Sequence, residues 1–230
     1  MKIEYPSQEF EGPKIVSTQI MELRKEYSLA ALDEDTIEKN PFVQFEKWFQ
    51  EAINAQLTEP NAMHLSTVNP DGKPSGRIVL LKGLIDNQFI FYTNYESPKA
   101  IALSHQPFAA ITFFWPELER QIRIEGIVSK LSSGASYEYF KLRPRESQIS
   151  AWASPQSQVV NSRKELEASW AAIQEKFKDI PEIPLPPNWG GYGLSPSRFE
   201  FWQGRKNRLH DRFLYIPITD NSWKIQRLAP

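Results

Sequence analysis

The chain has 230 residues, of which 40% are hydrophobic and 13% aromatic, so it holds ample apolar material for a folded core and is not a disordered chain. Its 27 Lys and Arg residues offset 28 Asp and Glu residues, and the resulting net charge of -1 gives no support for nucleic-acid binding. The absence of cysteine excludes disulfides, thiolate nucleophiles and cysteine-ligated metals.

The first half of the chain predicts two helices followed by an antiparallel sheet. Apolar residues at helical spacing predict helices at residues 17–32 and after Pro41, so an N-terminal helical segment is expected over about residues 1–57. From Met63 onward, short β-branched and aromatic runs alternate with turn sequences. These runs predict strands at 63–68, 76–82, 89–93, 109–115 and 121–131, and a short helix is expected at 98–104.

The second half returns to helical patterns before the sheet is completed. Helices are predicted at 137–142 and 163–177, and Ser147 is expected to cap a short helix between them. Residues 181–187 form a proline-rich extended connector, and the glycines of 190–193 are expected to form a bend. Strands at 199–202, 213–217 and 223–227 would finish the sheet. The expected fold is therefore one domain, 1–230, that is mainly β with flanking helices.

Two clusters of basic residues lie in strand or helix-end contexts. Arg77 and Lys82 are five positions apart in a predicted strand, so they face opposite sides unless a bulge intervenes, and a charged edge strand is the simpler interpretation. Tyr139 and Arg143 share a helical face, and Ser147 begins the next helix, whose free N–H groups favour an anion. This second cluster is either a phosphate site or a basic surface turn.

A third cluster follows an aromatic strand that ends near Trp202. Arg208, His210 and Arg212 suit a planar anionic ring, although His210 beside Asp211 can equally be a structural pair. The other two histidines are far away in sequence, so no metal site is expected.

Taken together, several motifs resemble the pyridoxamine 5′-phosphate oxidase family from about Arg24 to the end of the chain. The motifs occur in the same order as in that family, and they are Arg77-Ile78-Val79-Leu80-Leu81-Lys82, Phe91-Tyr92-Thr93-Asn94, Arg143-Pro144-Arg145-Glu146-Ser147-Gln148, Phe201-Trp202-Gln203-Gly204 and Arg208-Leu209-His210-Asp211-Arg212-Phe213. The resemblance implies an FMN-binding split β-barrel and a homodimer with FMN at the subunit interface.

Motif matching also implies roles for individual residues. The residues implied to bind FMN are Arg77, Ile78, Val79, Leu80, Leu81, Lys82, Tyr92, Thr93, Lys99, Gln121, Gln156, Ser157, Trp202 and Arg212. Those implied to bind the substrate phosphate are Lys82, Tyr139, Arg143 and Ser147. Arg208 and His210 would act as catalytic residues over the substrate ring, with Leu209 beside them, and Arg24 and Tyr27 would help to cover the substrate.

The reaction implied by the resemblance is oxidation of pyridoxamine or pyridoxine 5′-phosphate to pyridoxal 5′-phosphate, a step of vitamin B6 synthesis and salvage. Oxygen would accept the electrons and form hydrogen peroxide. One departure is Pro98, which stands where the family commonly has an arginine on the FMN phosphate. Another split-barrel flavoprotein, such as a flavin reductase, or a carrier of pyridoxal phosphate without turnover remain as alternatives.

The chain offers no sign of export or of membrane attachment. Its first residues lack an apolar signal core, and no run of about 20 apolar residues could span a bilayer. A cytoplasmic enzyme of small phosphorylated molecules is therefore expected, with neither nucleic acid nor membrane as a partner.

Overall fold

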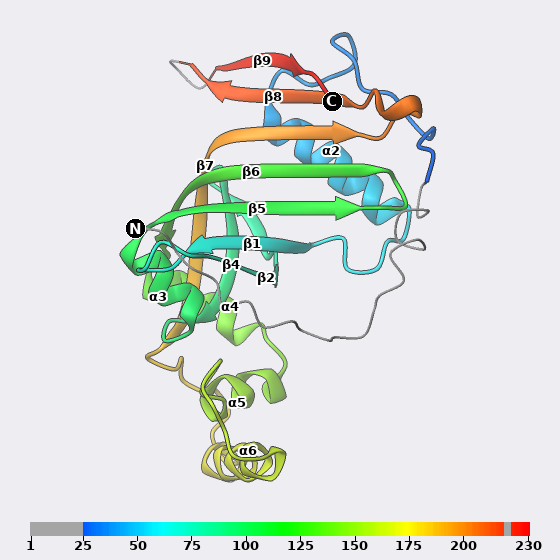
Figure 1. Ribbon diagram of the computed structural model, residues 1–230. Coiled ribbons are helices and arrows are strands. Elements are labelled where there is room, and N and C mark those ends of the chain that lie inside the picture. The colour runs from blue at the N-terminus through cyan, green and yellow to red at the C-terminus, as the bar shows by residue number, and fades with distance from the viewer. Residues whose placement is uncertain (1–24, 219–221) are drawn as a thin grey trace, which may run out of the picture.

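A computed structural model describes residues 25–218 and 222–230, and an antiparallel sheet curled into a half-barrel dominates these parts of the chain (Figure 1). Within them, nine strands are joined in the order β2-β1-β5-β6-β7-β4-β3, and β8 pairs with both β7 and β9. The strands are β1 (Ala62–Val68), β2 (Pro74–Leu80), β3 (Gly83–Ile85), β4 (Gln88–Asn94), β5 (Phe108–Trp115), β6 (Arg120–Lys130), β7 (Trp189–Gln203), β8 (Asp211–Pro217) and β9 (Trp223–Leu228).

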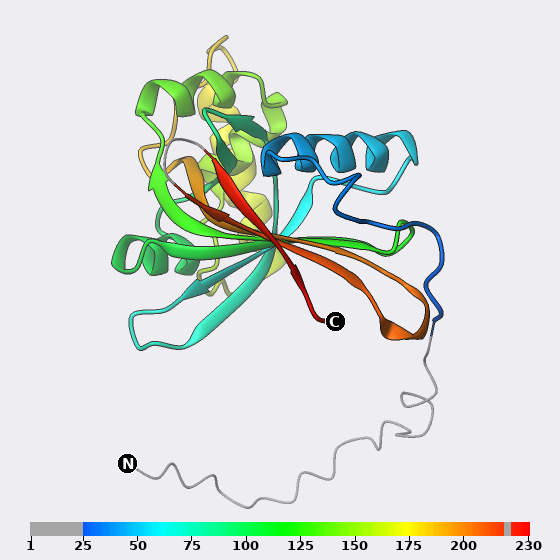
Figure 2. The same cartoon turned by 90° about the horizontal axis from the view of Figure 1, so that it is seen from above.

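Helix α2 (Pro41–Asn54) covers one face of the sheet (Figure 2). Its start is fixed by Asn40, whose side-chain oxygen accepts the Phe42 N–H at 2.9 Å, and by Pro41 in the first turn. The buried face of α2 carries Phe45, whose ring centre lies 4.8 Å from that of Phe89 and 5.2 Å from that of Phe113. The core is therefore an aromatic layer between this helix and the inner face of the sheet.

A second group of helices lies at one end of the sheet (Figure 1). It consists of α4 (Ser133–Lys141), α5 (Arg145–Ala153) and α6 (Arg163–Phe177), whereas α3 (Pro98–His105) links β4 to β5. Phe140, Ile149 and Phe177 form a separate buried cluster with Trp189 at the start of β7. Among the described residues, no helix is both long and apolar enough to cross a bilayer.

Strand β7 runs where a bend was expected at residues 190–193, so that prediction was wrong. None of these glycines has a positive φ, and they serve instead to let neighbouring side chains approach the backbone. A Cβ atom on Gly190 would lie 2.1 Å from the Tyr95 hydroxyl oxygen. The glycines are needed for close approach and not for a turn.

Three helix predictions also differ from the structure. The helix predicted at 137–142 spans Ser133–Lys141, so it begins four residues earlier. Residues 25–32 are not helical, and the rest of the helix predicted at 17–32 lies outside the described residues. Ser147 does not cap α5, because this helix begins at Arg145 directly after Pro144. A proline is tolerated at a helix start but not in its interior, so Pro144 sets the N-cap three residues earlier than expected.

The position of Phe45 gives a test of the core. Truncation to Ala leaves a cavity between α2 and the sheet, so Phe45→Ala should lower the free energy of unfolding by about 3–5 kcal/mol. Val43→Ala on the exposed face of the same helix is the matched control, and its effect should stay within about 0.5 kcal/mol. Denaturant unfolding of the two variants measures the difference, and equal losses would contradict this packing.

Candidate functional site

Many of the predicted site residues line one cavity of about 530 Å³, called here the first cavity. It opens between the end of β2, β4 and the α4–α5 junction. Its lining residues are Ile78, Val79, Leu80, Lys82, Tyr92, Thr93, Lys99, Tyr139, Leu142, Arg143, Pro144, Ser147, Gln156 and Trp189. All four residues predicted at the substrate phosphate are among them, and so are eight of those predicted at the cofactor, with Lys82 in both sets.

Lys99 lies at the wall of the first cavity, in the first turn of α3. Its Nζ donates to Thr93 Oγ1 at 2.9 Å and to Gln156 Oε1 at 2.8 Å, so neutral oxygens hold it in place. Burial, together with the positive charge of Arg77, lowers the pKa of Lys99 to about 8. A bound anion would relieve both effects.

Arg77 supports the same wall without being part of the cavity lining. Its guanidinium donates to Thr67 Oγ1 at 2.8 Å and Ser75 Oγ at 2.6 Å, and burial lowers its pKa. Within the described residues, neither Arg77 nor Lys99 forms a salt bridge with a carboxylate. Two neighbouring cations without a counter-ion form a site that favours an anion.

Arg143 provides a third cation in the first cavity. Its guanidinium lies over the Trp189 ring, 4.7 Å from the centroid, and burial lowers its pKa. Its Nη1 atom is buried and has no hydrogen-bond partner in the described part of the chain. A buried donor left unpaired is costly, so this atom is suited to an anionic acceptor that enters the cavity.

The backbone beside Arg143 is held by a residue of the same motif. Gln148 donates from Nε2 to the carbonyl oxygens of Arg143, at 2.8 Å, and Lys141, at 3.2 Å. Trp189 and Gln148 were not predicted as site residues. Trp189 could not be found from its spacing, because the strand that carries it was predicted to begin ten residues later.

Four further predicted residues, Tyr27, Trp202, Arg208 and His210, line a second cavity of about 790 Å³. It is lined by Lys25, Glu26, Tyr27, Trp202, Arg205, Asn207, Arg208 and His210. Arg208 ends the short helix η1 (Lys206–Arg208) between β7 and β8, and the neighbouring Leu209 is exposed. The first and second cavities share no lining residue, so the predicted site residues form two separate groups within one chain.

Gln121 and Arg212 adjoin this second group through the sheet. Gln121 pairs with Trp202 between β6 and β7, and Trp202 pairs with Arg212 between β7 and β8, so the three side chains share one face. Arg212 is oriented by buried Glu200, whose Oε1 accepts its Nε–H at 2.9 Å.

Besides Arg77, Leu209, Gln121 and Arg212, the predicted residues Leu81 and Ser157 also line neither cavity. Leu81 is buried, Ser157 follows Gln156 with a φ of 67°, and Arg24 lies outside the described residues. In the described part of the chain, no three His, Asp or Glu side chains form a candidate metal site.

His210 has a defined protonation state in this arrangement. Its Nδ1 accepts the backbone N–H of Arg205 at 3.1 Å, so the neutral ring carries its proton on Nε2. Burial lowers the pKa of His210, and Arg208 and Arg212 lower it further against the opposing effect of Asp211. His210 is therefore a neutral hydrogen-bond donor near pH 7, with its ring 4.7 Å from that of Trp202.

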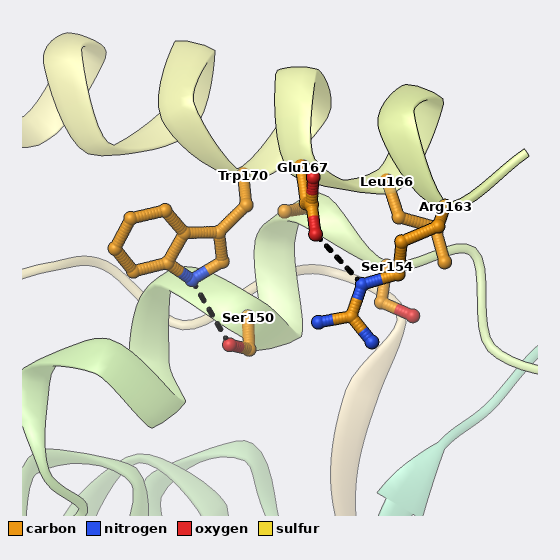
Figure 3. Close-up of a pocket in the computed structure, with 7 residues that line it drawn as sticks. Ser150, Ser154, Arg163, Leu166, Glu167 and Trp170 are labelled. Carbon is orange, nitrogen blue, oxygen red and sulfur yellow. Dashed lines mark hydrogen bonds and ion pairs between the residues drawn. The ribbon is translucent and has the colours of Figure 1, made fainter.

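A further cavity of about 410 Å³ lies between α5 and α6 (Figure 3). Arg163 at its rim is already paired with Glu167 at 2.8 Å, and the Trp170 indole donates to Ser150 Oγ at 3.1 Å. None of the predicted site residues lines it. Because Arg163 already has Glu167 as its partner, this cavity offers no unpaired charge to a ligand. The first and second cavities are therefore the candidate site.

Comparison with known proteins agrees with the fold and with the motifs. The family model described as pyridoxamine 5′-phosphate oxidase matches residues 49–177, and the model for the pyridoxine 5′-phosphate oxidase C-terminal dimerisation region matches residues 189–230. The fold is that of the split-barrel class, as predicted from the sequence. Within that class, the chain belongs to the pyridoxamine 5′-phosphate oxidase family.

Individual relatives cover nearly the whole chain. Pyridoxine/pyridoxamine 5′-phosphate oxidases from Paraburkholderia xenovorans and Gloeothece citriformis are each 51% identical, covering 93% and 92% of this chain and 100% and 98% of their own. The crystal structure of PhzG from Burkholderia lata, in complex with tetrahydrophenazine-1-carboxylic acid, is 29% identical with a TM-score of 0.81, covering 88% of this chain and 100% of its own. A pyridoxamine 5′-phosphate oxidase-related FMN-binding protein from Nostoc punctiforme shares the fold, with 21% identity and a TM-score of 0.68 over 84% of this chain and 100% of its own.

The state of His210 can be measured directly. In ¹⁵N NMR spectra of the protein, the His210 ring should show the Nε2–H tautomer and should become protonated only below about pH 6.5, the usual range for histidine. His64→Gln and His105→Gln variants assign the three histidine signals. A proton on Nδ1 at neutral pH, or a pKa above the usual range, would contradict the hydrogen bond from Arg205.

Proposed function

We propose that the protein binds FMN and oxidises pyridoxamine 5′-phosphate and pyridoxine 5′-phosphate to pyridoxal 5′-phosphate, with oxygen as electron acceptor and hydrogen peroxide as product. This activity would serve vitamin B6 synthesis and salvage. Family membership supports the reaction class. The observation that carries the proposal is the first cavity, where the half-buried cations Lys99 and Arg143 have no carboxylate partner among the described residues and the buried Arg143 Nη1 atom lacks any acceptor there.

The cations of the first cavity fit two phosphate groups. Lys99 and the adjacent Arg77 would pair with the FMN phosphate, since Lys99 is held by neutral oxygens and its positive charge is destabilised by burial. Lys82, Arg143 and Ser147 would bind the substrate phosphate, with Tyr139 beside them. When bound, FMN would supply the hydride acceptor that the protein itself lacks.

The second cavity supplies the other face of the proposed substrate site. Arg208 would lie against the substrate ring, and neutral His210 would donate a hydrogen bond from Nε2 to a ring substituent. These residues would orient the ring and hold its charge, while the flavin performs the oxidation. His210 is not suited to accept a proton at Nδ1, because the Arg205 N–H occupies that atom.

A homodimer would join the two halves of the site. Trp189 at one end of β7 lines the first cavity, whereas Trp202 near its other end lines the second, and roughly 40 Å of extended chain separates them. Five of the eight residues that line the second cavity, from Trp202 to His210, also lie within residues 189–230, which match the dimerisation region of the family. The second cavity of one protomer would therefore face the first cavity of its partner.

The outer face of the sheet supports this arrangement. Ile78 is 64% exposed and Phe114 is 58% exposed. Strand register places both on the face that carries Gln121 and Trp202, since Ile78 pairs with His64, His64 with Thr112, and Phe114 with Gln121. An exposed apolar face beside proposed cofactor residues suits a second copy of the chain.

The proposed reaction is tested by aerobic incubation of FMN-loaded protein with each vitamer, following pyridoxal phosphate and peroxide. Both pyridoxamine 5′-phosphate and pyridoxine 5′-phosphate should be oxidised. The kcat/KM for unphosphorylated pyridoxamine should be at least about 100-fold lower, since each charged hydrogen bond to the phosphate contributes roughly 1.5–3 kcal/mol. Peroxide formation only with a reduced nicotinamide would indicate a flavin reductase. Binding of pyridoxal phosphate without turnover would indicate a carrier.

The pKa of Lys99 gives a second test, on cofactor binding alone. A phosphate favours protonated Lys99, so FMN affinity of the apoprotein should fall as pH rises above about 8, by up to about tenfold per pH unit until the raised pKa of the complex is reached. Riboflavin lacks the phosphate and serves as the control ligand. Lys99→Arg should remove the dependence, because arginine keeps its charge; an unchanged pH profile in this variant would exclude Lys99 as its source.

A further inference from the structure

Residues 25–32, called here the N-terminal segment, lie along the loop between β7 and β8 (Figures 1 and 2). The segment has no helix or strand of its own, so its position depends on contacts with the rest of the chain. Two carboxylates make the main polar contacts. Asp211 accepts the Leu32 N–H at 3.1 Å, and Glu119 binds the segment near Tyr27.

Glu119 is a buried carboxylate in the turn between β5 and β6, with only 2% of its surface exposed. Its Oε2 accepts the backbone N–H groups of Ser28 at 2.8 Å and Leu29 at 3.0 Å. The Lys25 ammonium lies 3.7 Å from Oε1 but is itself largely exposed, so its contribution is small. The two amides therefore account for most of the stabilisation of this buried charge.

The main chain of Glu119 fixes the other side of the same junction. Its carbonyl oxygen accepts the Gly204 N–H at 2.7 Å and Gln203 Nε2 at 3.2 Å, at the end of β7. Glu119 adopts a φ of 54°, which is unfavourable for a residue with a side chain. One strained residue thus joins the N-terminal segment to the strand that carries Trp202.

The residue placed by this junction is Tyr27, directly before Ser28. Its ring contacts Trp202 edge-on at 5.6 Å and His210 at 5.8 Å between centroids. Its Cγ lies so close to the Gly204 backbone that a Cβ there would be 2.7 Å away. Tyr27 therefore fills the space above a glycine and forms one wall of the second cavity.

We propose that Glu119 is a positioning residue: by binding the Ser28 and Leu29 amides, it holds Tyr27 against Trp202 and His210 and completes the substrate side of the second cavity. This inference rests on the proposed function for its effect on catalysis, but not for the anchoring itself. Glu119 acts through Tyr27 and does not touch the substrate.

Hydrogen exchange tests the anchor without any need for activity. In the full-length holoprotein, the Ser28 and Leu29 amides should be protected, and Glu119→Ala should increase their exchange at least about tenfold, as expected when a hydrogen bond to a charged group is lost. The Leu32 amide, bound by Asp211, should keep its protection. Glu117→Ala, in the same turn but exposed, is the matched control and should change neither.

Steady-state kinetics tests whether the anchor acts through Tyr27. Glu119→Ala should lower kcat/KM for pyridoxamine 5′-phosphate by at least about tenfold, with FMN content unchanged. Glu119→Gln keeps one acceptor oxygen, so its kcat/KM should lie between those of the wild type and Glu119→Ala. In a Tyr27→Ala background, Glu119→Ala should add little, because both variants remove the same wall.

Two results would overturn the proposal. Unchanged exchange of Ser28 and Leu29 in Glu119→Ala would show that the carboxylate is no anchor. If Glu119→Ala lowers kcat/KM by the same factor in the wild-type and the Tyr27→Ala backgrounds, then Glu119 does not act through Tyr27. If the wild-type protein oxidises neither pyridoxamine 5′-phosphate nor pyridoxine 5′-phosphate, the proposed function fails. The exchange experiment alone then decides whether Glu119 anchors the N-terminal segment.

Discussion

The long antiparallel pairing of β6 with β7 organises the whole sheet. The two strands remain paired from Arg120 and Gln203 at one end to Lys130 and Tyr192 at the other, with a single register shift beside Glu125. Gly126 permits that shift, since a Cβ there would lie 2.1 Å from the Ser195 carbonyl oxygen. Because β7 pairs with β4 at its start and with β8 at its end, it sets the positions of both cavities.

The chemistry of the first cavity follows from what the sheet and helices leave unpaired. The fold buries Arg143 and Lys99 enough to lower their pKa values, yet no carboxylate among the described residues pairs with them. By contrast, the acidic residues near the second cavity are occupied: Asp211 binds Arg205 and Arg227, and Glu200 binds Arg212 and Arg123. Lys99 and Arg143 at the first cavity thus have no carboxylate partner among the described residues, whereas ion pairs fix Arg205 and Arg212 near the second cavity.

Much of the fold could be predicted from local patterns in the sequence, but contacts between distant residues could not. The helix at 163–177 was predicted with its observed bounds, and most strand bounds were predicted within one or two residues, because periodicity and turn residues are local signals. Residues 17–32 have helical spacing, but the amides of Ser28, Leu29 and Leu32 bind Glu119 and Asp211, about 90 and 180 positions away. For the site, the motifs named residues that the structure gathers around two cavities. The spacing of Arg77 and Lys82 did not predict that both residues lie at one cavity. Strand β2 ends at Leu80, so Lys82 lies beyond the strand and lines the cavity.

The position of β7 in the chain has a consequence for biosynthesis. This strand lies between β6 and β4 in the sheet, yet it begins only at Trp189. While the ribosome makes the preceding residues, one edge of β4 and one edge of β6 lack their partner, and both strands carry buried apolar residues such as Phe91 and Ile122. Unpaired apolar edges favour association between chains. A nascent chain is therefore most prone to aggregate just before its last 40 or so residues emerge, and interrupted translation products that end before β7 should be removed by proteolysis rather than accumulate as folded protein.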